Sequence, residues 1–197
     1  MKINKDYFYL SSDIDRMRYF FGQGNVVAHT IDRFKWHIFP KFHIAPGFPT
    51  HIDIEAASIC QLKCPMCTQC LMDKSSLGVM DFSLYKKIID ECAKRGVYSI
   101  KLSWRGEPLL NPRIVDMVAY AKKKGIKDVA FLSNGERLND RLTEELIRAG
   151  LDWISISIDG LDRTYDSIRY PSKFKDIVRK VKKIRETRER LGTESLS

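Results

Sequence analysis

Four cysteines crowd into one short stretch of this chain, and their spacing is typical of an iron–sulfur ligand loop. They are Cys60, Cys64, Cys67 and Cys70, separated by three, two and two residues. Zinc sites usually take their ligands as two separated pairs, and ferredoxin-type loops space their cysteines in another order. Three closely spaced thiolates would bind three irons of a 4Fe-4S cluster and leave the fourth iron open for chemistry. The spacing favours a catalytic cluster, with a zinc site and an electron-carrier cluster as alternatives.

The three cysteines Cys60, Cys64 and Cys67 resemble the CxxxCxxC signature of the radical S-adenosylmethionine (SAM) superfamily. The resemblance implies that these residues bind a 4Fe-4S cluster whose open iron chelates the amino and carboxylate groups of SAM. It also implies that the loop follows the first strand of a partial (β/α) barrel. One departure is Met66, at a position that is often aromatic in the family. Cys70 lies outside the signature, and we interpret it as a spare loop thiol, with a role as alternative ligand left open.

A repeated strand–loop–helix pattern begins at His51. Expected strands cover residues 51–57, 98–103, 128–132 and 153–159, and expected helices cover 82–94, a segment from Pro112, 140–149, and a segment from Phe174 to about Gly192. Such alternation is typical of parallel strands joined through helices. Three of the strands alternate apolar and polar residues, which suggests that their polar face lines a cavity. We therefore predict an α/β fold, a curved, partial (β/α) barrel with about four strand–helix units.

The first 49 residues form an N-terminal extension that is rich in aromatic residues, and residues 50–197 form the predicted core domain. Within the extension, Val27, Ile31, Phe34 and Ile38 recur at helical spacing and predict a helix over 25–38. We expect this apolar stripe to pack against the barrel. Because the segment is also basic, binding to a partner or to a membrane surface is the alternative.

Two further motifs follow the second and third strands. Arg105-Gly106-Glu107-Pro108 is similar to the GGEP motif of the radical SAM family, in which a backbone carbonyl and the glutamate contact the SAM amino group. By this resemblance Gly106 and Glu107 are cofactor-binding residues, although Arg105 replaces the first glycine and could instead reach an anionic group. Asn134 lies in a Ser-Asn-Gly turn that resembles the family's TNG turn beside the cofactor.

The last matching segment follows the fourth strand. Ser157 and Asp159 resemble the family segment beside the SAM ribose and carboxylate, and similar enzymes place an arginine at the position of Arg169 against the carboxylate. A guanidinium suits such a bidentate contact. For Arg169, a surface salt bridge is an equal alternative. Four further polar residues line the expected cavity and are candidates for substrate contact or for mere lining: Asp53, Glu55, Lys101 and Ser103.

The function implied by the resemblance is reductive cleavage of SAM to a 5′-deoxyadenosyl radical, which abstracts hydrogen from an unknown substrate. An electron donor such as flavodoxin or ferredoxin is then an expected partner. The alternative is a binding module that holds an iron–sulfur cluster or zinc without catalysis. Peptide, sugar, nucleoside and RNA substrates all stay open.

Composition limits these functions further. The net charge of +9 would suit nucleic acid, but the basic residues concentrate on segments that read as solvated helix faces, so nucleic acid is not favoured. The sequence has no apolar run of about eighteen residues and no signal-peptide pattern at its start, and its crowded cysteines suit a reducing compartment. We therefore expect a cytoplasmic protein. Four strand–helix units are fewer than the six or so of the family core, so we expect a fragment that binds its cluster more robustly than SAM.

Overall fold

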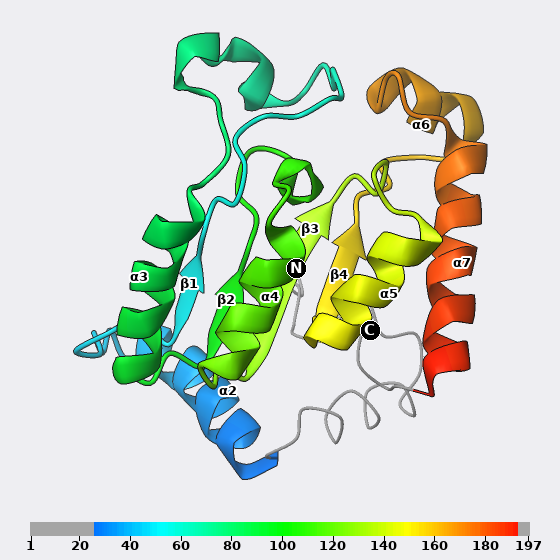
Figure 1. The fold of residues 1–197 in the computed structure, drawn as a ribbon. Coiled ribbons are helices and arrows are strands. Elements are labelled where there is room, and N and C mark those ends of the chain that lie inside the picture. The colour runs from blue at the N-terminus through cyan, green and yellow to red at the C-terminus, as the bar shows by residue number, and fades with distance from the viewer. Residues whose placement is uncertain (1–25, 193–197) are drawn as a thin grey trace.

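Four parallel strands, hydrogen-bonded in chain order, form the sheet that positions the cysteine loop (Figure 1). The computed structural model describes residues 26–192. The strands are β1 (His51–Asp53), β2 (Ser99–Lys101), β3 (Asp128–Ser133) and β4 (Trp153–Ile156). Ile52 lies opposite Ile100, Ile100 opposite Val129, and Phe131 opposite Ile154. The parallel order and the intervening helices confirm the predicted partial (β/α) barrel of four units.

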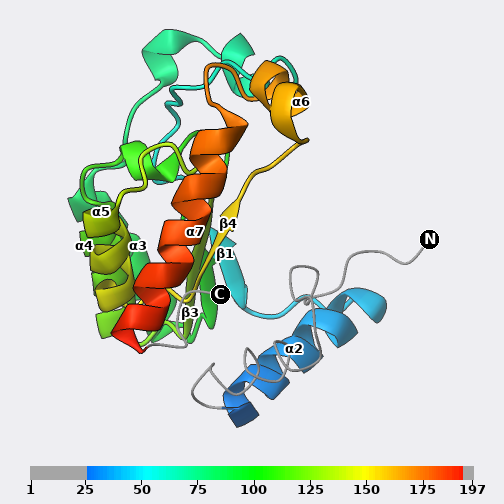
Figure 2. The same ribbon diagram turned by 90° about the vertical axis from the view of Figure 1, so that its right-hand side faces the viewer.

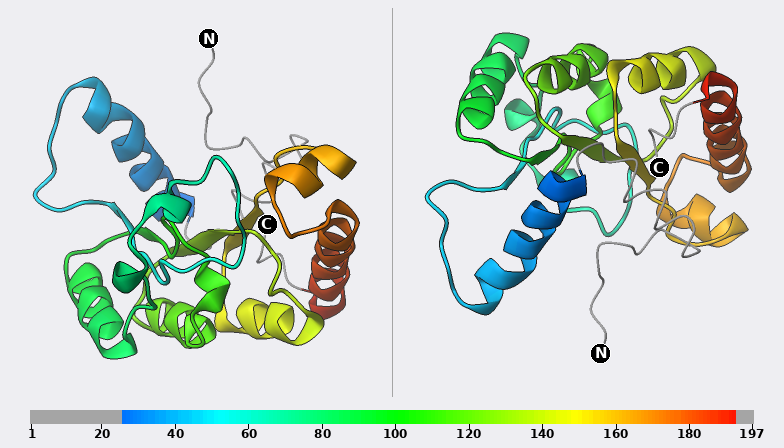
Figure 3. Two further views of the ribbon diagram at one scale, coloured as in Figure 1. Left: turned by 90° about the horizontal axis from the view of Figure 1, so that it is seen from above. Right: turned by 90° about the horizontal axis from the view of Figure 1, so that it is seen from below.

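In the part of the chain that the structure describes, helices cover one face of this sheet and leave the other largely open (Figure 3). The α-helices are α2 (Val26–Lys41), α3 (Phe82–Lys94), α4 (Ile114–Lys123), α5 (Asp140–Ala149), α6 (Asp162–Ile168) and α7 (Phe174–Leu191). Short 3-10 helices are η1 (Thr68–Leu71), η2 (Lys74–Ser76) and η3 (Pro108–Leu110). Helices α3, α4 and α5 line one face, and α7 follows beyond α5. Between residues 26 and 192, no helix is both long and apolar enough to cross a membrane.

The core lies between the sheet and these helices, as the alternating pattern of the strands predicts. Ile54, Ile100 and Phe131 are buried against the helices. The third strand, whose parity the sequence left undecided, turns Val129 and Phe131 into the core, while Leu132 is exposed. The strands are shorter than expected, because the chain leaves the sheet after each short ladder to build the loops at its carboxyl edge.

The helix ends follow the sequence at three of the four expected helices. Asp81 caps α3 by accepting hydrogen bonds from two backbone N–H groups, and α5 and α7 end at Gly150 and Gly192 in the left-handed conformation. The helix expected to begin at Pro112 instead begins at Ile114. The reason is that Asn111 ends η3 and turns its side-chain amide to the carbonyl oxygens of Ala56 and Met80.

Helix α2 contradicts the expected packing of its apolar stripe. The helix forms where predicted, but Val27, Ile31 and Phe34 are 67%, 50% and 62% exposed. The buried face is instead polar, with His29 and Asp32 turned toward the rest of the molecule. Residues 1–25 of the expected N-terminal extension and residues 193–197 lie outside the described residues, and the domain boundary near residue 50 stays a prediction.

A half-buried acidic pair, Asp128 and Asp152, lies at the amino-terminal edge of the sheet, where β3 and β4 begin. Asp152 accepts hydrogen bonds from Lys122 Nζ at 2.8 Å and from Val129 N at 2.7 Å. Asp128 is less well satisfied, since its enclosed Oδ1 atom finds no hydrogen-bond partner among the described residues. Burial, and then the charge of Asp152, raise the pKa of Asp128 to about 7, against the opposing effect of Arg33. Asp128 is therefore a source of instability at neutral pH.

We expect the Asp128→Asn variant to lose part of the pH dependence of folding. The folded carboxyl keeps its proton up to about pH 7, whereas the unfolded one releases it near 3.8, so the folded state holds more protons between these values. Stability contributed by this group is therefore full below 3.8 and falls as pH rises, by up to about 4 kcal/mol. Denaturant unfolding at about pH 4 and about pH 8 measures it. Asp116→Asn, at an exposed position, is the control. If Asp128→Asn loses as much unfolding free energy between the two pH values as the unsubstituted protein does, the raised pKa of Asp128 is contradicted.

Candidate cofactor site

The four clustered cysteines follow β1 at the carboxyl edge of the sheet, at the top of Figure 1. They line one cavity of about 630 Å³ together with Leu62, Met66 and neighbouring loop residues. Cys64 is buried, Cys60 and Cys67 are half-buried, and Cys70 is exposed. The loop turns tightly, because Cys67 N donates to Cys64 O at 3.0 Å and Cys70 N donates to Cys67 O at 3.3 Å. Cys92, the fifth cysteine, lies apart from this loop in α3, where it is 1% exposed and belongs to the core.

Two of the signature sulfurs receive donors from distant parts of the chain. Asn134 Nδ2 lies 3.6 Å from Cys60 Sγ, and an Nη atom of Arg169 lies 3.9 Å from Cys64 Sγ. Burial raises the pKa of both thiols, and these two neighbours act in the opposite direction. Iron is bound by thiolates, so the amide and the guanidinium favour the form that a metal requires.

The thiols share one cavity, and the way they line it bears on the kind of metal group they could hold. Within residues 26–192, no three His, Cys, Asp or Glu side chains converge closely enough to hold one metal ion. In a cluster each iron takes its own thiolate, so the sulfurs stand apart around a shared group. Thiols spread around one cavity, with donors aimed at two of them, fit that group. Cys60, Cys64 and Cys67 are the residues that could hold it.

Gly106 and Glu107 fasten the loop after β2 to the cysteine loop. A Cβ atom at residue 106 would lie 2.3 Å from Ala57 O and 2.6 Å from Ile59 O, so close backbone approach requires glycine there. Glu107 N donates to Ile59 O at 2.8 Å. From the sequence we expected glycine here because it would let SAM reach the backbone carbonyl. The structure adds that a side chain would collide with the backbone of residues 57–59.

The carboxylate of Glu107 is buried and accepts three hydrogen bonds. Ser133 Oγ and Leu109 N donate to Oε1 at 2.7 and 3.1 Å, and Asn134 N donates to Oε2 at 2.7 Å. Burial raises the pKa of Glu107, and these donors lower it part of the way back. A carboxylate offers about four acceptor positions, so Oε2 keeps one for a further donor.

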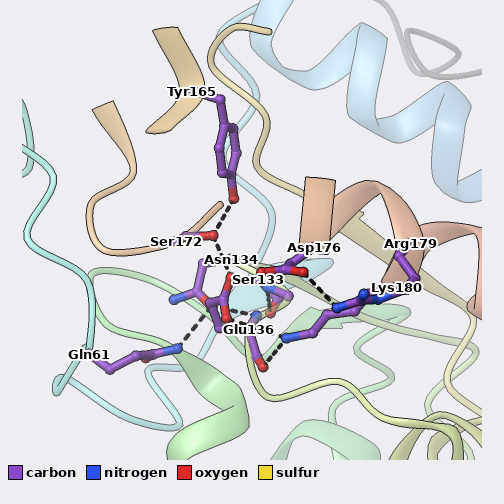
Figure 4. A network of polar contacts seen from close by, with 10 residues as sticks. Gln61, Ser133, Asn134, Glu136, Tyr165, Ser172, Asp176, Arg179 and Lys180 are labelled. Carbon is purple, nitrogen blue, oxygen red and sulfur yellow. Dashed lines mark hydrogen bonds and ion pairs between the residues drawn. The ribbon is translucent and has the colours of Figure 1, made fainter. Parts of the chain in front are cut away.

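The Asn134 turn joins the site to the loop after α6 through a chain of polar contacts (Figure 4). Asn134 Oδ1 accepts from Gln61 Nε2 at 3.1 Å and from Glu136 N at 3.0 Å. The Glu136 carboxylate in turn binds Ser172 Oγ and Lys180 Nζ. Tyr165, Ser172 and Lys180 come from α6, the following loop and α7, so the network ties three segments to the cysteine loop.

Arg169 and Asp159, predicted separately, form one ion pair. The Arg169 guanidinium binds Asp159 Oδ2 while also reaching Cys64 Sγ. Ser157 lies beside the Asn134 turn, since its backbone N donates to Ser133 O at 2.9 Å. All six predicted cofactor residues therefore lie on the loops at the carboxyl edge. Their contacts with SAM stay predictions.

The four cavity-lining candidates all have protein partners. Lys101 Nζ lies 3.0 Å from Asp53 Oδ1, and Ser103 Oγ accepts from Leu132 N at 3.0 Å. Glu55 binds Arg105 through Nε at 3.0 Å and through Nη2 at 2.6 Å. The Arg105 guanidinium holds the pKa of Glu55 below its usual value. Arg105 is thus engaged by Glu55, which leaves it less suited to the anionic group suggested from the sequence.

Sequence reasoning missed Gln61 and Glu136, which hold Asn134 in place. Gln61 directly follows the first signature cysteine, and its position in the loop was the one available signal. Glu136 gave no signal, because a lone glutamate after a turn is ordinary on a protein surface.

The model of the radical SAM superfamily matches residues 54–193. A cofactor-modifying protein for tungsten-containing aldehyde ferredoxin oxidoreductase from Pyrococcus furiosus is 31% identical over 145 residues, which cover 73% of this chain and 40% of that protein. A GTP 3′,8-cyclase from Chlorobaculum tepidum is 34% identical over 131 residues, covering 64% of this chain and 38% of that enzyme. The chain thus spans less than half the length of these relatives.

Solved structures show the same fold at lower identity. SuiB from Streptococcus suis, bound to S-adenosylmethionine, has a TM-score of 0.63 and 18% identity, over 81% of this chain and 37% of that one. BtrN, in complex with AdoMet and 2-DOIA, has a TM-score of 0.58 and 18% identity, over 78% of this chain and 57% of that one.

The Gly106→Ala variant tests the close approach of the two loops. A methyl group there meets backbone atoms that cannot rotate away, so we expect the free energy of unfolding to fall by about 1–3 kcal/mol. Gly78→Ala is the matched control, since its Cβ would meet nothing within 4 Å. Denaturant unfolding of both variants gives the comparison. Equal stability of the two would show that the loops are not in contact at Gly106.

Proposed function

The chain belongs to the radical SAM superfamily, and from this premise we propose that its cysteine loop holds a 4Fe-4S cluster used for radical catalysis. The proposed ligands are Cys60, Cys64 and Cys67, with one iron left for SAM. When bound, this cluster supplies the electron that cleaves SAM reductively, which yields a radical able to abstract hydrogen from a substrate. The substrate is unassigned.

The observation that supports this proposal is the contact of two signature sulfurs with residues from two separate segments that follow β3 and β4. Asn134 follows β3 and reaches Cys60, while Arg169 follows α6 and reaches Cys64. In parallel α/β folds, functional residues gather at the carboxyl ends of strands. A loop that merely held a metal would not require cofactor-binding residues around it, so this grouping argues against the non-catalytic alternative.

The chain's own residues have distinct proposed roles. The free acceptor position on Glu107 Oε2 suits the ammonium of SAM, and Gly106 leaves its backbone carbonyl accessible. Arg169 has five N–H donors, of which some stay available beyond Asp159 and Cys64 for the SAM carboxylate. Ser157 and Asp159 are proposed beside the ribose. Positioning of this kind, with water excluded, is what such a protein contributes to its cofactor's chemistry.

The proposed reaction also requires a route for the substrate, a source of electrons and a reducing compartment. The open polar face of the sheet, with Asp53 and Lys101, is the proposed side of substrate entry. An external electron donor such as flavodoxin or ferredoxin is the proposed reductant. Thiols that must stay reduced favour the cytoplasm as the compartment.

The cluster assignment predicts which cysteines bind iron. After anaerobic reconstitution we expect about four irons per chain. Alanine at Cys60, Cys64 or Cys67 should remove most of this iron, because each thiolate binds a different iron. Cys70→Ala and Cys92→Ala are the controls and should keep the brown colour and the iron content. Zinc as the only bound metal, or iron loss in either control, would contradict the ligand set.

Binding of SAM tests the role of Glu107. The Glu107→Gln variant removes the charge proposed to meet the SAM ammonium, so we expect SAM affinity to fall about tenfold to a hundredfold. Calorimetric titration under anaerobic conditions measures the affinity, and iron analysis verifies that the cluster stays. Glu91→Gln, on the exposed face of α3, is the control.

Catalysis is tested with the same proteins. With dithionite as reductant, the unsubstituted protein should release 5′-deoxyadenosine from SAM, and Arg169→Ala should release less while keeping its iron. A protein that holds four irons and binds SAM but releases no 5′-deoxyadenosine would favour a non-catalytic binding module. Loss of iron in Arg169→Ala would assign the arginine to the cluster alone.

A further inference from the structure

Helix α2 turns its apolar side to solvent, against the usual orientation of a surface helix. Val27, Ile31 and Phe34 recur at the spacing of one helix face, and all three are at least 50% exposed. The exposed apolar surface continues past the helix end with Phe42 and Ile44, which are 61% and 48% exposed. These five residues form what we call the α2 ridge.

The opposite side of α2 holds the ridge in this orientation. His29 Nδ1 lies 3.1 Å from the hydroxyl of Tyr98, and both His29 and Asp32 are almost fully buried. The ring of Trp36 meets His51 edge-on, with centroids 5.7 Å apart. Because these contacts anchor the polar side of the helix, the ridge cannot turn inward without breaking them.

The exposed charged residues of α2 are all positive. They are Lys35 and Lys41, which border the ridge. Asp32 is the single acidic residue between positions 26 and 50, and it is buried against Arg33. Lys41 Nζ lies 5.8 Å from the ring centre of Phe42, so a positive charge lies directly beside an apolar residue of the ridge.

We propose that the α2 ridge docks the protein onto an anionic lipid surface. An exposed apolar helix face bordered by basic residues is the pattern of a helix that lies in a membrane interface. Helix α2 stands out from the rest of the molecule as a convex rod about 24 Å long (Figure 2). Lipid headgroups and chains can close around such a rod, whereas a protein partner would have to supply a matching groove with acidic walls.

The docked orientation leaves the cofactor site accessible. Helix α2 lies below the sheet, and the cysteine loop lies at its top (Figure 1). Contact of the ridge with a lipid surface therefore keeps the cysteine loop on the side of the molecule that faces solvent. The inference is independent of the proposed catalysis, since it rests on α2 alone.

Vesicle flotation of the full chain tests the proposal. We expect the protein to float with vesicles of mixed phosphatidylcholine and phosphatidylglycerol, and to stay behind with phosphatidylcholine alone. Ile31→Asp should weaken binding at least about tenfold, because it replaces an aliphatic side chain proposed to enter the lipid with a charged one. Leu84→Asp is the matched control, since Leu84 is also 50% exposed but lies on α3. Lys35→Glu should weaken binding severalfold, and Lys182→Glu on α7 should not.

Three results would overturn the proposal. The first is the absence of binding to anionic vesicles by a protein that is folded by circular dichroism. The second is equal loss of binding in Ile31→Asp and Leu84→Asp, which would indicate a general effect of charge. The third is a dimer in solution that Ile31→Asp converts to monomer while vesicle binding stays unchanged, which would assign the ridge to a second copy of the chain.

Discussion

The buried carboxylate of Glu107 is the interaction on which the site depends. A charge in such a place is costly unless its oxygens are hydrogen-bonded, and here three donors satisfy it. Two of the donors, Ser133 Oγ and Asn134 N, belong to the turn after β3. The carboxylate therefore fixes that turn against the loop after β2, and with it the amide that reaches Cys60. Loss of this one group would loosen the turn and leave its donors buried and unpaired.

The rest of the site is built outward from this fixed turn. At Gly106 the loop after β2 packs directly against the backbone of residues 57–59, just before the cysteine loop. The ion pair with Asp159 holds the guanidinium of Arg169 next to Cys64. The donors thus reach the sulfurs from two directions. This arrangement suits the proposed cluster, because ligand orientation and hydrogen bonding to sulfur tune a bound metal.

The molecule separates its two unusual surfaces. The polar, cysteine-containing surface lies at the carboxyl edge of the sheet, and the apolar α2 ridge lies beyond the amino-terminal edge (Figure 1). The sheet between them packs its buried core against the helices that cover one face. Each surface can therefore serve a binding role without disturbing the other.

The amino-acid sequence by itself determined the features that depend on neighbouring residues. Cysteine spacing singled out the loop that we propose as the cluster ligand loop, alternation indicated the strands, and Gly150 and Gly192 marked two helix ends. Only the tertiary structure decided which groups meet. The contact of Arg169 with Cys64 joins residues 105 positions apart, and that of Gln61 with Asn134 joins residues 73 apart. It also decided that α2 buries its polar side, because helical spacing shows which residues share a face but not which face has a partner.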